Sequence, residues 1–507
     1  MRPHRTHLLT AALLLFTFVA LLAILVPTIA DPDLWGHVRY GLDMLEARTI
    51  IRTDPYSYLS EPGTWINHEW LAEVSFALAY RAGGSQGLVL FKVAMGLATA
   101  GVIYVTLRQR GVRLLVRCAV LLLMMAGIRF AISPVRPQLF TALGFACLLW
   151  IFTAYETRPR ALYWAIPVML IWTNAHGGFL AGVGFLGIWY ATQALMRVHA
   201  QDSLHPLVSR EFISLSIPVL LAIASTVLNP YGLDHWRFLL ETATVARPEI
   251  TDWQPLAAFS PLLLLYFALM ALGGWALYRS KRRLSVPMLV LYIVSSALAL
   301  VAVRHLLFFV MTWAVVHGEH LDSALEYMLP QRLRHSQQRG LATALLTVAI
   351  VIVLTIVARN PFDVVIGSTP YPARAVAALQ DHLDGADMVT PFNWGQYILW
   401  HLGPENQVSL DGRRETVYTD EVYLMNLAFM TGRTDWDALL DAHPPDLVFT
   451  DKSLASYNLM TLMPDWALVY EDPLCGVFVP YDSHLRGVLE SATLPDLPYD
   501  GEGLSFP

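Results

Sequence analysis

Long apolar runs are the feature that most constrains how this chain can fold. Spanning the hydrocarbon core of a bilayer takes about 20 mostly apolar residues. Eleven runs near this length lie at 8–27, 87–106, 114–132, 138–155, 161–174, 178–196, 212–228, 259–277, 285–302, 305–321 and 341–358. Since 55% of the 507 residues are hydrophobic and the mean hydropathy is +0.48, we predict a mainly α-helical, polytopic membrane protein with about 11 transmembrane helices.

The first run resembles a secretory signal peptide in its flanks, because Arg2 and Arg5 precede it and small residues follow it up to Ala30. Its apolar core is longer than the roughly 7–15 residues of such peptides, and many further apolar runs follow. We therefore expect it to remain as the first transmembrane helix, with a cleaved signal peptide as the alternative.

Lys and Arg are concentrated in alternate loops, and loops of this kind stay on the cytoplasmic side. With a cytoplasmic N-terminus, one side collects Arg108, Arg110, Arg113, Arg158, Arg160, Arg197, Arg210, Arg279, Lys281, Arg282, Arg283, Arg332, Arg334 and Arg339. We expect a multi-pass protein of the plasma (inner) membrane. Segment 31–86 and the residues after about 358 then lie on the periplasmic or extracellular side.

Charge and cysteine content argue against two classes of protein. The net charge of −6 comes with no polybasic excess, so we expect no nucleic-acid partner. Cys118 and Cys147 fall in apolar runs and Cys475 lies far from both, which gives neither a disulfide framework nor a metal-type cysteine spacing.

After about residue 359 the apolar runs shorten to strand length. Candidate strands lie at 387–390, 407–410, 446–450, 467–470 and 476–480, with helical patterns at 371–383 and 435–442. We predict two domains: a transmembrane domain over 1–358, which includes a large first outer loop at 31–86, and a small C-terminal α/β domain over 359–507.

The first outer loop is dense in polar and titratable side chains for a chain with only 15% charged residues. Helical spacing of apolar residues from Trp35 to Leu45, and again from Trp70 to Leu78, predicts two amphipathic helices on the membrane surface. The candidate reactive groups of this loop are Asp31, Asp33, His37, Asp54, His68, Glu69 and Glu73.

The sequence Asp31-Pro32-Asp33 has two interpretations. A helix start explains Asp31 as the N-cap, Pro32 at the first helical position and Asp33 in the first turn. A carboxylate between Trp35, His37 and a membrane surface is also suited to general base catalysis, and we predict this role for Asp33, with Asp31 as partner or alternate.

His68-Glu69-Trp70-Leu71-Ala72 lacks the second histidine of a zinc-protease helix, because Ala72 occupies its position. His68 and Glu69 are then either residues that cap and orient the second surface helix or substrate-binding residues. A divalent cation held by Asp31, Asp33 and His37, with His68 and Glu69 nearby, is a further hypothesis that the spacing does not specify.

Several cationic side chains lie at the outer ends of the predicted helices. Arginine near hydrocarbon is costly unless it is paired or serves an anionic ligand. Pairing with loop carboxylates is one interpretation, and binding of a lipid-linked phosphate is the other. The candidates are Arg129, Arg136, His176, Arg304 and His305; Glu249, Trp253 and Pro255 belong to the next outer loop and could close the same cavity or form turns.

Two C-terminal motifs, Asn393-Trp394-Gly395-Gln396-Tyr397 and Leu410-Asp411-Gly412-Arg413-Arg414-Glu415, are compatible with carbohydrate recognition. Asp-Gly is also common where a strand ends in a turn. We favour the structural interpretation for both.

These motifs together resemble the C-type glycosyltransferase (GT-C) superfamily of integral membrane enzymes, in particular bacterial members of unknown function related to glycosyltransferase family 39. The similarity covers most of the chain. It is carried by the Asp-x-Asp of the first outer loop and by the sequences at 31–35, 65–71, 135–138, 174–178, 393–395 and 411–413.

The resemblance implies transfer of a sugar from a polyprenyl-phosphate donor to an acceptor hydroxyl at the outer membrane face, with inversion. The general base implied is an acidic residue of the first outer loop, which is Asp33 here. A lipid-linked sugar transporter or flippase is a competing hypothesis, although the runs at 138–155, 212–228, 259–277, 285–302 and 341–358 hold no Asp, Glu, Lys or Arg. A non-catalytic assembly factor for envelope polysaccharide is another.

Overall fold

The computed structural model describes residues 7–507 except 62, 64, 203, 243–244, 246, 248–249, 258–259, 327–334, 360 and 491–493. Glu249, Arg332 and Arg334, which entered the predictions above, lie outside the described residues. The chain forms two compact units. We name Met1–Thr28 with Val89–Phe362 the helical unit, and Ile29–Leu88 with Asp363–Pro507 the mixed unit.

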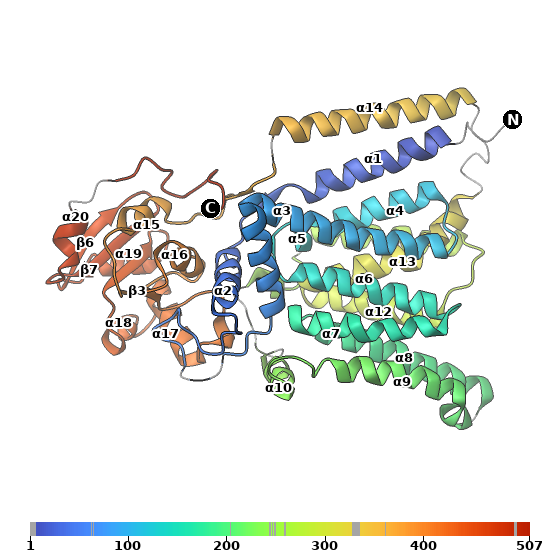
Figure 1. Ribbon diagram of the computed structural model, residues 1–507, viewed down its shortest axis with the longest axis horizontal. Coiled ribbons are helices and arrows are strands. Elements are labelled where there is room, and N and C mark those ends of the chain that lie inside the picture. The colour runs from blue at the N-terminus through green and yellow to red at the C-terminus, as the bar shows by residue number, and fades with distance from the viewer. Residues whose placement is uncertain are drawn as a thin grey trace. The chain divides into compact units, whose positions relative to one another are not determined.

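Each of the eleven predicted spans coincides with a helix (Figure 1). The helices are α1 (His7–Leu25), α3 (Trp70–Gln109), α4 (Leu114–Gly127) with α5 (Arg129–Ile132), α6 (Gln138–Tyr155), α7 (Ala165–Ala175), α8 (Phe179–Gln201), α9 (Arg210–Ser225), α11 (Pro261–Arg279), α12 (Val286–Val301), α13 (Leu306–Leu325) and α14 (His335–Arg359). A short helix, α10 (Leu233–Thr242), follows α9.

In the described part of the chain, six helices are long and apolar enough to cross a membrane: α1, α3, α6, α8, α11 and α14. Two shorter helices, α4 and α12, are also apolar. Helix α14 packs along α1 and leaves large side chains such as Leu354 and Val357 exposed, as a lipid-facing helix does (Figure 1). The protein is thus a polytopic membrane protein.

Loops that were predicted to share a side do share an end of the helical unit. At one end, Arg113 Nε donates to Asp322 Oδ1 at 2.7 Å, and Arg110 pairs with Glu319. At the other, Lys92 Nζ donates to the carbonyl oxygens of Pro27 at 2.9 Å and Ser133 at 2.8 Å. These contacts agree with the predicted alternation for the loops that they join, and the side that faces the cytoplasm stays a prediction.

The mixed unit contains a five-stranded sheet in the order β4-β3-β5-β7-β6. Its strands are β3 (Asp387–Val389), β4 (Gln407–Val408), β5 (Leu447–Asp451), β6 (Trp466–Glu471) and β7 (Cys475–Pro480). β3 pairs in parallel with β4 and β5, whereas β7 pairs antiparallel with β5 and β6. The surrounding helices are α15 (Ala373–Leu379), α16 (Gly395–Leu402), α17 (Asp420–Thr431), α18 (Ala438–Ala442), α19 (Ala455–Met460) and α20 (Leu485–Glu490). The predicted small α/β domain is present.

The first outer loop groups with the C-terminal domain, not with the transmembrane domain as the predicted division had it. The backbone N–H of Val408 donates to Tyr56 O at 3.1 Å, and that of Glu61 donates to Val417 O at 3.0 Å. The loop groups with the C-terminal domain because these hydrogen bonds satisfy its backbone polar groups. In hydrocarbon the same groups would have no hydrogen-bond partner.

The first predicted surface helix is α2 (Leu34–Ala47), and its apolar stripe is covered by protein. Trp35 is completely buried, with its ring centroid 4.7 Å from that of Tyr371 and 5.2 Å from that of Tyr397. The aromatic spacing that predicted contact with lipid headgroups therefore reflects packing against the C-terminal domain, including α16.

The second predicted surface helix is the first part of α3. It crosses α2 at Gly41, where a Cβ would lie 2.1 Å from the carbonyl oxygen of Glu73, so only glycine allows this approach. The helical geometry of α3 is broken at Gly83 and Gly84, and Gly84 has the left-handed φ of 56° that favours glycine. This break separates the loop part of α3 from its apolar span.

Candidate functional site

Asp33 sits immediately before α2, which begins at Leu34. It occupies the N-cap position, but its side chain makes no capping hydrogen bond. Asp31 Oδ1 instead accepts the backbone N–H of Asp33 at 3.1 Å, and the Asp33 carbonyl accepts the N–H of His37 at 3.0 Å. The carboxylate of Asp33 is half-buried, and helix capping does not explain it.

The C-terminal domain lies against the Asp33 carboxylate. A Cβ on Gly412 would come within 2.2 Å of Asp33 Oδ1 and 3.1 Å of Gln396 Nε2. On the α2 side, the backbone N–H of Gly36 donates to Gln396 Oε1 at 3.3 Å. The two motifs for which we favoured a structural role therefore both contribute a residue beside Asp33.

His37 lies one helical turn after Asp33 and is held by carboxylates. Its Nδ1–H donates to Glu73 Oε1 at 3.3 Å, and its Nε2 lies 4.0 Å from Glu69 Oε2. Glu73 Oε2 also accepts from Asn67 Nδ2 at 2.5 Å. Burial acts to lower the pKa of His37, but the hydrogen bond to Glu73 and the charges of Glu69, Glu73 and Asp33 outweigh it and raise the pKa from 6.5 to about 9. The imidazole is therefore protonated at neutral pH.

The divalent cation considered for Asp31, Asp33 and His37 stays a prediction. Among the described residues, no three His, Cys, Asp or Glu side chains are grouped as metal ligands. His37, one of the three predicted ligands, lies with Nδ1 3.3 Å from Glu73 Oε1. His68 lies against Glu69, with Nε2 and Oε1 3.7 Å apart. The orienting role and the substrate-binding role considered for these two residues both stay predictions.

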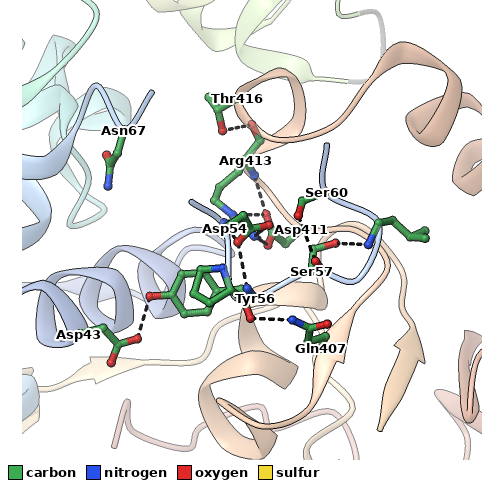
Figure 2. A network of polar contacts seen from close by, with 12 residues as sticks. Asp43, Asp54, Tyr56, Ser57, Ser60, Asn67, Gln407, Asp411, Arg413 and Thr416 are labelled. Atoms are coloured by element: carbon green, nitrogen blue, oxygen red, sulfur yellow. Dashed lines mark hydrogen bonds and ion pairs between the residues drawn. The ribbon is translucent and has the colours of Figure 1, made fainter. Parts of the chain in front are cut away.

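A buried ion-pair network fixes the first outer loop to the C-terminal domain (Figure 2). The guanidinium of Arg413 donates to Asp411 Oδ2 and to Asp54 Oδ1, each at 2.6 Å. It also lies about 5 Å from the ring centroids of Tyr40, Tyr56 and Trp65. Burial acts to lower the pKa of Arg413, but Asp411, Tyr40 and Asp54 raise it well above its ordinary value, so the pairs stay charged.

The helical unit gathers three arginines around the short helix η3 (Thr251–Trp253), and we name them the arginine cluster: Arg136, Arg247 and Arg304. Arg136 Nη1 lies 3.5 Å from Asp252 Oδ2. The guanidinium carbons of Arg247 and Arg304 lie 4.0 Å and 4.2 Å from the ring centroid of Trp253. Arg136 and Arg304 were predicted from the sequence, whereas Arg247 was missed although it shares the outer loop with Trp253.

The two histidines predicted to join these arginines have packing contacts of their own. His176 is buried, and its Nδ1 accepts from Thr141 Oγ1 at 2.6 Å and from the Gly178 N–H at 3.2 Å. Nδ1 of His305 lies 3.2 Å from the carbonyl oxygen of Leu298. These contacts hold helix ends together, and a role in substrate binding stays a prediction for both.

No protein-family model and no curated protein sequence matches this chain. The fold is nevertheless similar to solved structures. The archaeal oligosaccharyltransferase AglB from Archaeoglobus fulgidus, in complex with an inhibitory peptide and a dolichol-phosphate, aligns with a TM-score of 0.57 and 12% identity over 87% of this chain and 69% of AglB. ArnT from Cupriavidus metallidurans, bound to undecaprenyl phosphate, aligns with a TM-score of 0.52 and 14% identity over 94% of this chain and 98% of ArnT.

The chain thus shares the fold of these membrane proteins. The apo form of the Archaeoglobus enzyme gives the same result, with a TM-score of 0.56 and 11% identity over 87% of this chain. At such low identity the likeness identifies an architecture and no residue roles.

Proposed function

We propose that this protein is a membrane-bound glycosyltransferase that moves a sugar from a polyprenyl-phosphate donor to an acceptor hydroxyl. The acceptor oxygen forms a bond to the anomeric carbon and loses its proton to the Asp33 carboxylate. The bond from the anomeric carbon to the phosphate oxygen breaks, its electron pair leaves with the polyprenyl phosphate, and the configuration inverts. Asp31 orients Asp33 through the hydrogen bond to its backbone N–H.

The environment of the Asp33 carboxylate is the observation that carries this proposal. This carboxylate is half-buried, does not cap the helix that it precedes, and lies one turn from the protonated His37. A carboxylate at this position can accept the proton of a substrate hydroxyl. The shared fold with AglB and ArnT, whose structures hold dolichol-phosphate and undecaprenyl phosphate, supports a lipid-linked donor.

We assign the donor phosphate to the arginine cluster. Guanidinium groups bind phosphate through paired N–H donors, and Arg247 and Arg304 share a single aromatic ring. Two guanidinium groups would stabilise the negative charge that develops on the leaving phosphate. The proposal also takes the N-terminus to be cytoplasmic and the mixed unit to lie outside the plasma membrane, as the Lys and Arg distribution predicts.

The test uses the full-length protein in proteoliposomes, with undecaprenyl-phosphate-linked hexoses, pentoses and amino sugars as donors and a cell-envelope extract as the source of acceptor. Release of undecaprenyl phosphate reports transfer. Asp33→Asn should lower the rate at least about 100-fold, as expected for loss of a general base, while insertion and thermal unfolding stay unchanged.

Substantial activity in Asp33→Asn would overturn the assignment of the base. Movement of the lipid-linked sugar between leaflets without any release would replace the transferase with a transporter. Neither release nor movement with any donor, together with silent replacement of Asp33 in cells, would favour an assembly factor.

A further inference from the structure

We infer that the C-terminal domain completes the Asp33 site, with Gly412 and Gln396 as the residues that position the carboxylate. This inference rests on the proposed function, because it concerns the same general base. It gives the C-terminal domain a part in the reaction itself, where the sequence had favoured a purely structural role for its motifs.

Gly412 and the Asp33 carboxylate lie in close approach. The Asp33 carboxylate occupies the side of Gly412 that a Cβ would fill, with Oδ1 only 2.2 Å from that position. Gly412 has no left-handed φ, so the need for glycine here comes from space alone. Any larger residue at 412 must push the carboxylate away.

Gly412 cannot itself retreat. Its chain neighbours Asp411 and Arg413 belong to the buried network with Asp54, and Asp411 is completely buried. The preceding residue, Leu410, is also held, because its carbonyl oxygen accepts from Thr390 Oγ1 at 3.1 Å. The backbone around Gly412 is therefore fixed in place, and the Asp33 side chain is the part of this contact that can move.

Gln396 on α16 forms a clamp. Its side chain is 4% exposed, its Oε1 accepts the Gly36 N–H, and its Nε2 lies against the same side of Gly412 as the Asp33 carboxylate. A Cβ on Gly36 would lie 2.4 Å from Gln396 Cδ, so the first turn of α2 is tightly packed on this amide. Gln396 thus fixes the helix start that carries Asp33.

A general base must be held within a fraction of an ångström of the proton that it accepts, and a misplacement of about 1 Å can cost roughly 100-fold in rate. Gly412 restricts the position of the carboxylate, and Gln396 restricts the backbone that bears it. Substitutions at these two positions should therefore affect turnover more than donor binding or folding.

Gly412→Ala is the direct test, with Gly63→Ala as its matched control. Gly63 lies in the same loop region as Asp33, and a Cβ there meets nothing within 4 Å. In the proteoliposome assay, Gly412→Ala should lower kcat for release of undecaprenyl phosphate about 10- to 100-fold. Binding of undecaprenyl phosphate itself and the thermal unfolding temperature should match wild type. A kcat within twofold of wild type would overturn the inference.

Gln396→Glu provides a second test that does not depend on steric fit, since it keeps the Oε1 acceptor and the shape of the side chain. It places a second carboxylate beside Asp33, and two adjacent carboxylates oppose each other's ionisation. The acid limb of the rate–pH profile should move to higher pH, a shift that a purely structural residue would not cause. An acid limb at the wild-type pH would contradict the positioning role of Gln396. If Gly412→Ala fails to fold, this rate–pH measurement alone decides whether the inference stands.

The Asp33→Asn measurement distinguishes a failure of the proposed function from a failure of the positioning role. If Asp33→Asn is inactive while Gly412→Ala and Gln396→Glu behave as wild type, the proposed function stands and the positioning role is wrong. If Asp33→Asn is active, the base has been misassigned, whatever the other two variants do.

Discussion

The buried ion pairs of the mixed unit and the arginine cluster of the helical unit hold their cations in different ways. In the mixed unit, Arg413 and His37 are buried and lie directly against carboxylates, at 2.6 Å from Asp411 and 3.3 Å from Glu73. In the helical unit, Arg247 and Arg304 share the ring of Trp253, and Arg136 lies at a longer 3.5 Å from its carboxylate.

The two kinds of contact have different consequences for stability and for ligand binding. A buried cation between carboxylates is neutralised within the fold, so its removal leaves uncompensated charge and lowers stability. A cation–π contact attracts a cation without cancelling its charge. If the arginine cluster binds phosphate as proposed, we expect stability effects in the mixed unit and ligand effects in the arginine cluster.

The largest expected effect is that of Arg413→Leu. It leaves Asp54 and Asp411 buried without their cation, and breaking a buried pair costs about 3–5 kcal/mol of unfolding free energy. Thermal unfolding of the full-length protein should show a strongly lowered transition. Arg486→Ala, which removes an exposed pair with Glu490, is the control and should leave the transition where it was. If the two variants unfold at the same temperature, the Arg413 network does not stabilise the mixed unit as argued.

The next effect is the pH dependence set by His37. Its pKa is raised on folding from 6.5 to about 9, so its contribution to stability is fully present below pH 6.5 and is lost as the pH rises through 9. The shift corresponds to roughly 3 kcal/mol as an upper value. Wild type should lose thermal stability between these pH values more steeply than His37→Gln. Parallel curves for the two proteins would contradict the charged state of His37.

Much of the helical unit could be predicted because its signal is local: an apolar run of sufficient length specifies a span without reference to any partner. The strands of the mixed unit were found in the same way. The union of the first loop with the C-terminal domain was not predictable, because Arg413 and Asp54 are 359 positions apart. The spacing of Trp35, Val38 and Leu42 predicts an apolar face on α2, but the same face would suit lipid or protein.

The residues of the candidate site also divide into those that local sequence indicates and those that only the folded structure reveals. Asp33, Arg136 and Arg304 were selected as candidates from residue type and predicted side, which local sequence supplies. His37 was considered as a metal ligand because imidazole suits metal, and only the contact with Glu73 on α3 reveals its ion pair. Gly412 could not be linked to Asp33 at all, since a glycine chosen for its lack of a side chain gives no signal of what it makes room for.

A smaller effect is expected for Arg304→Ala. Losing one charge-assisted contact to phosphate should weaken binding of undecaprenyl phosphate about 10-fold, measured by titration of the full-length protein in detergent. Thermal unfolding should be unchanged, in contrast to Arg413→Leu. Arg237→Ala, which removes an exposed arginine of α10, is the matched control. Loss of stability without loss of binding would mean that the arginine cluster is structural after all.

The smallest expected effect is that of a change at Asp252, and it tests the arginine cluster most directly. Its 50% exposed side chain lies against Arg136, and an ion pair as open as this adds about 0–1 kcal/mol to stability. If the arginine cluster binds phosphate, Asp252 is an anion that competes with the ligand. Asp252→Asn should therefore strengthen undecaprenyl phosphate binding by about 2- to 5-fold, more so at low salt, because screening weakens the repulsion that is removed. An unchanged or weaker affinity would mean that the phosphate does not approach Arg136, and would restrict the anion site to Arg247 and Arg304.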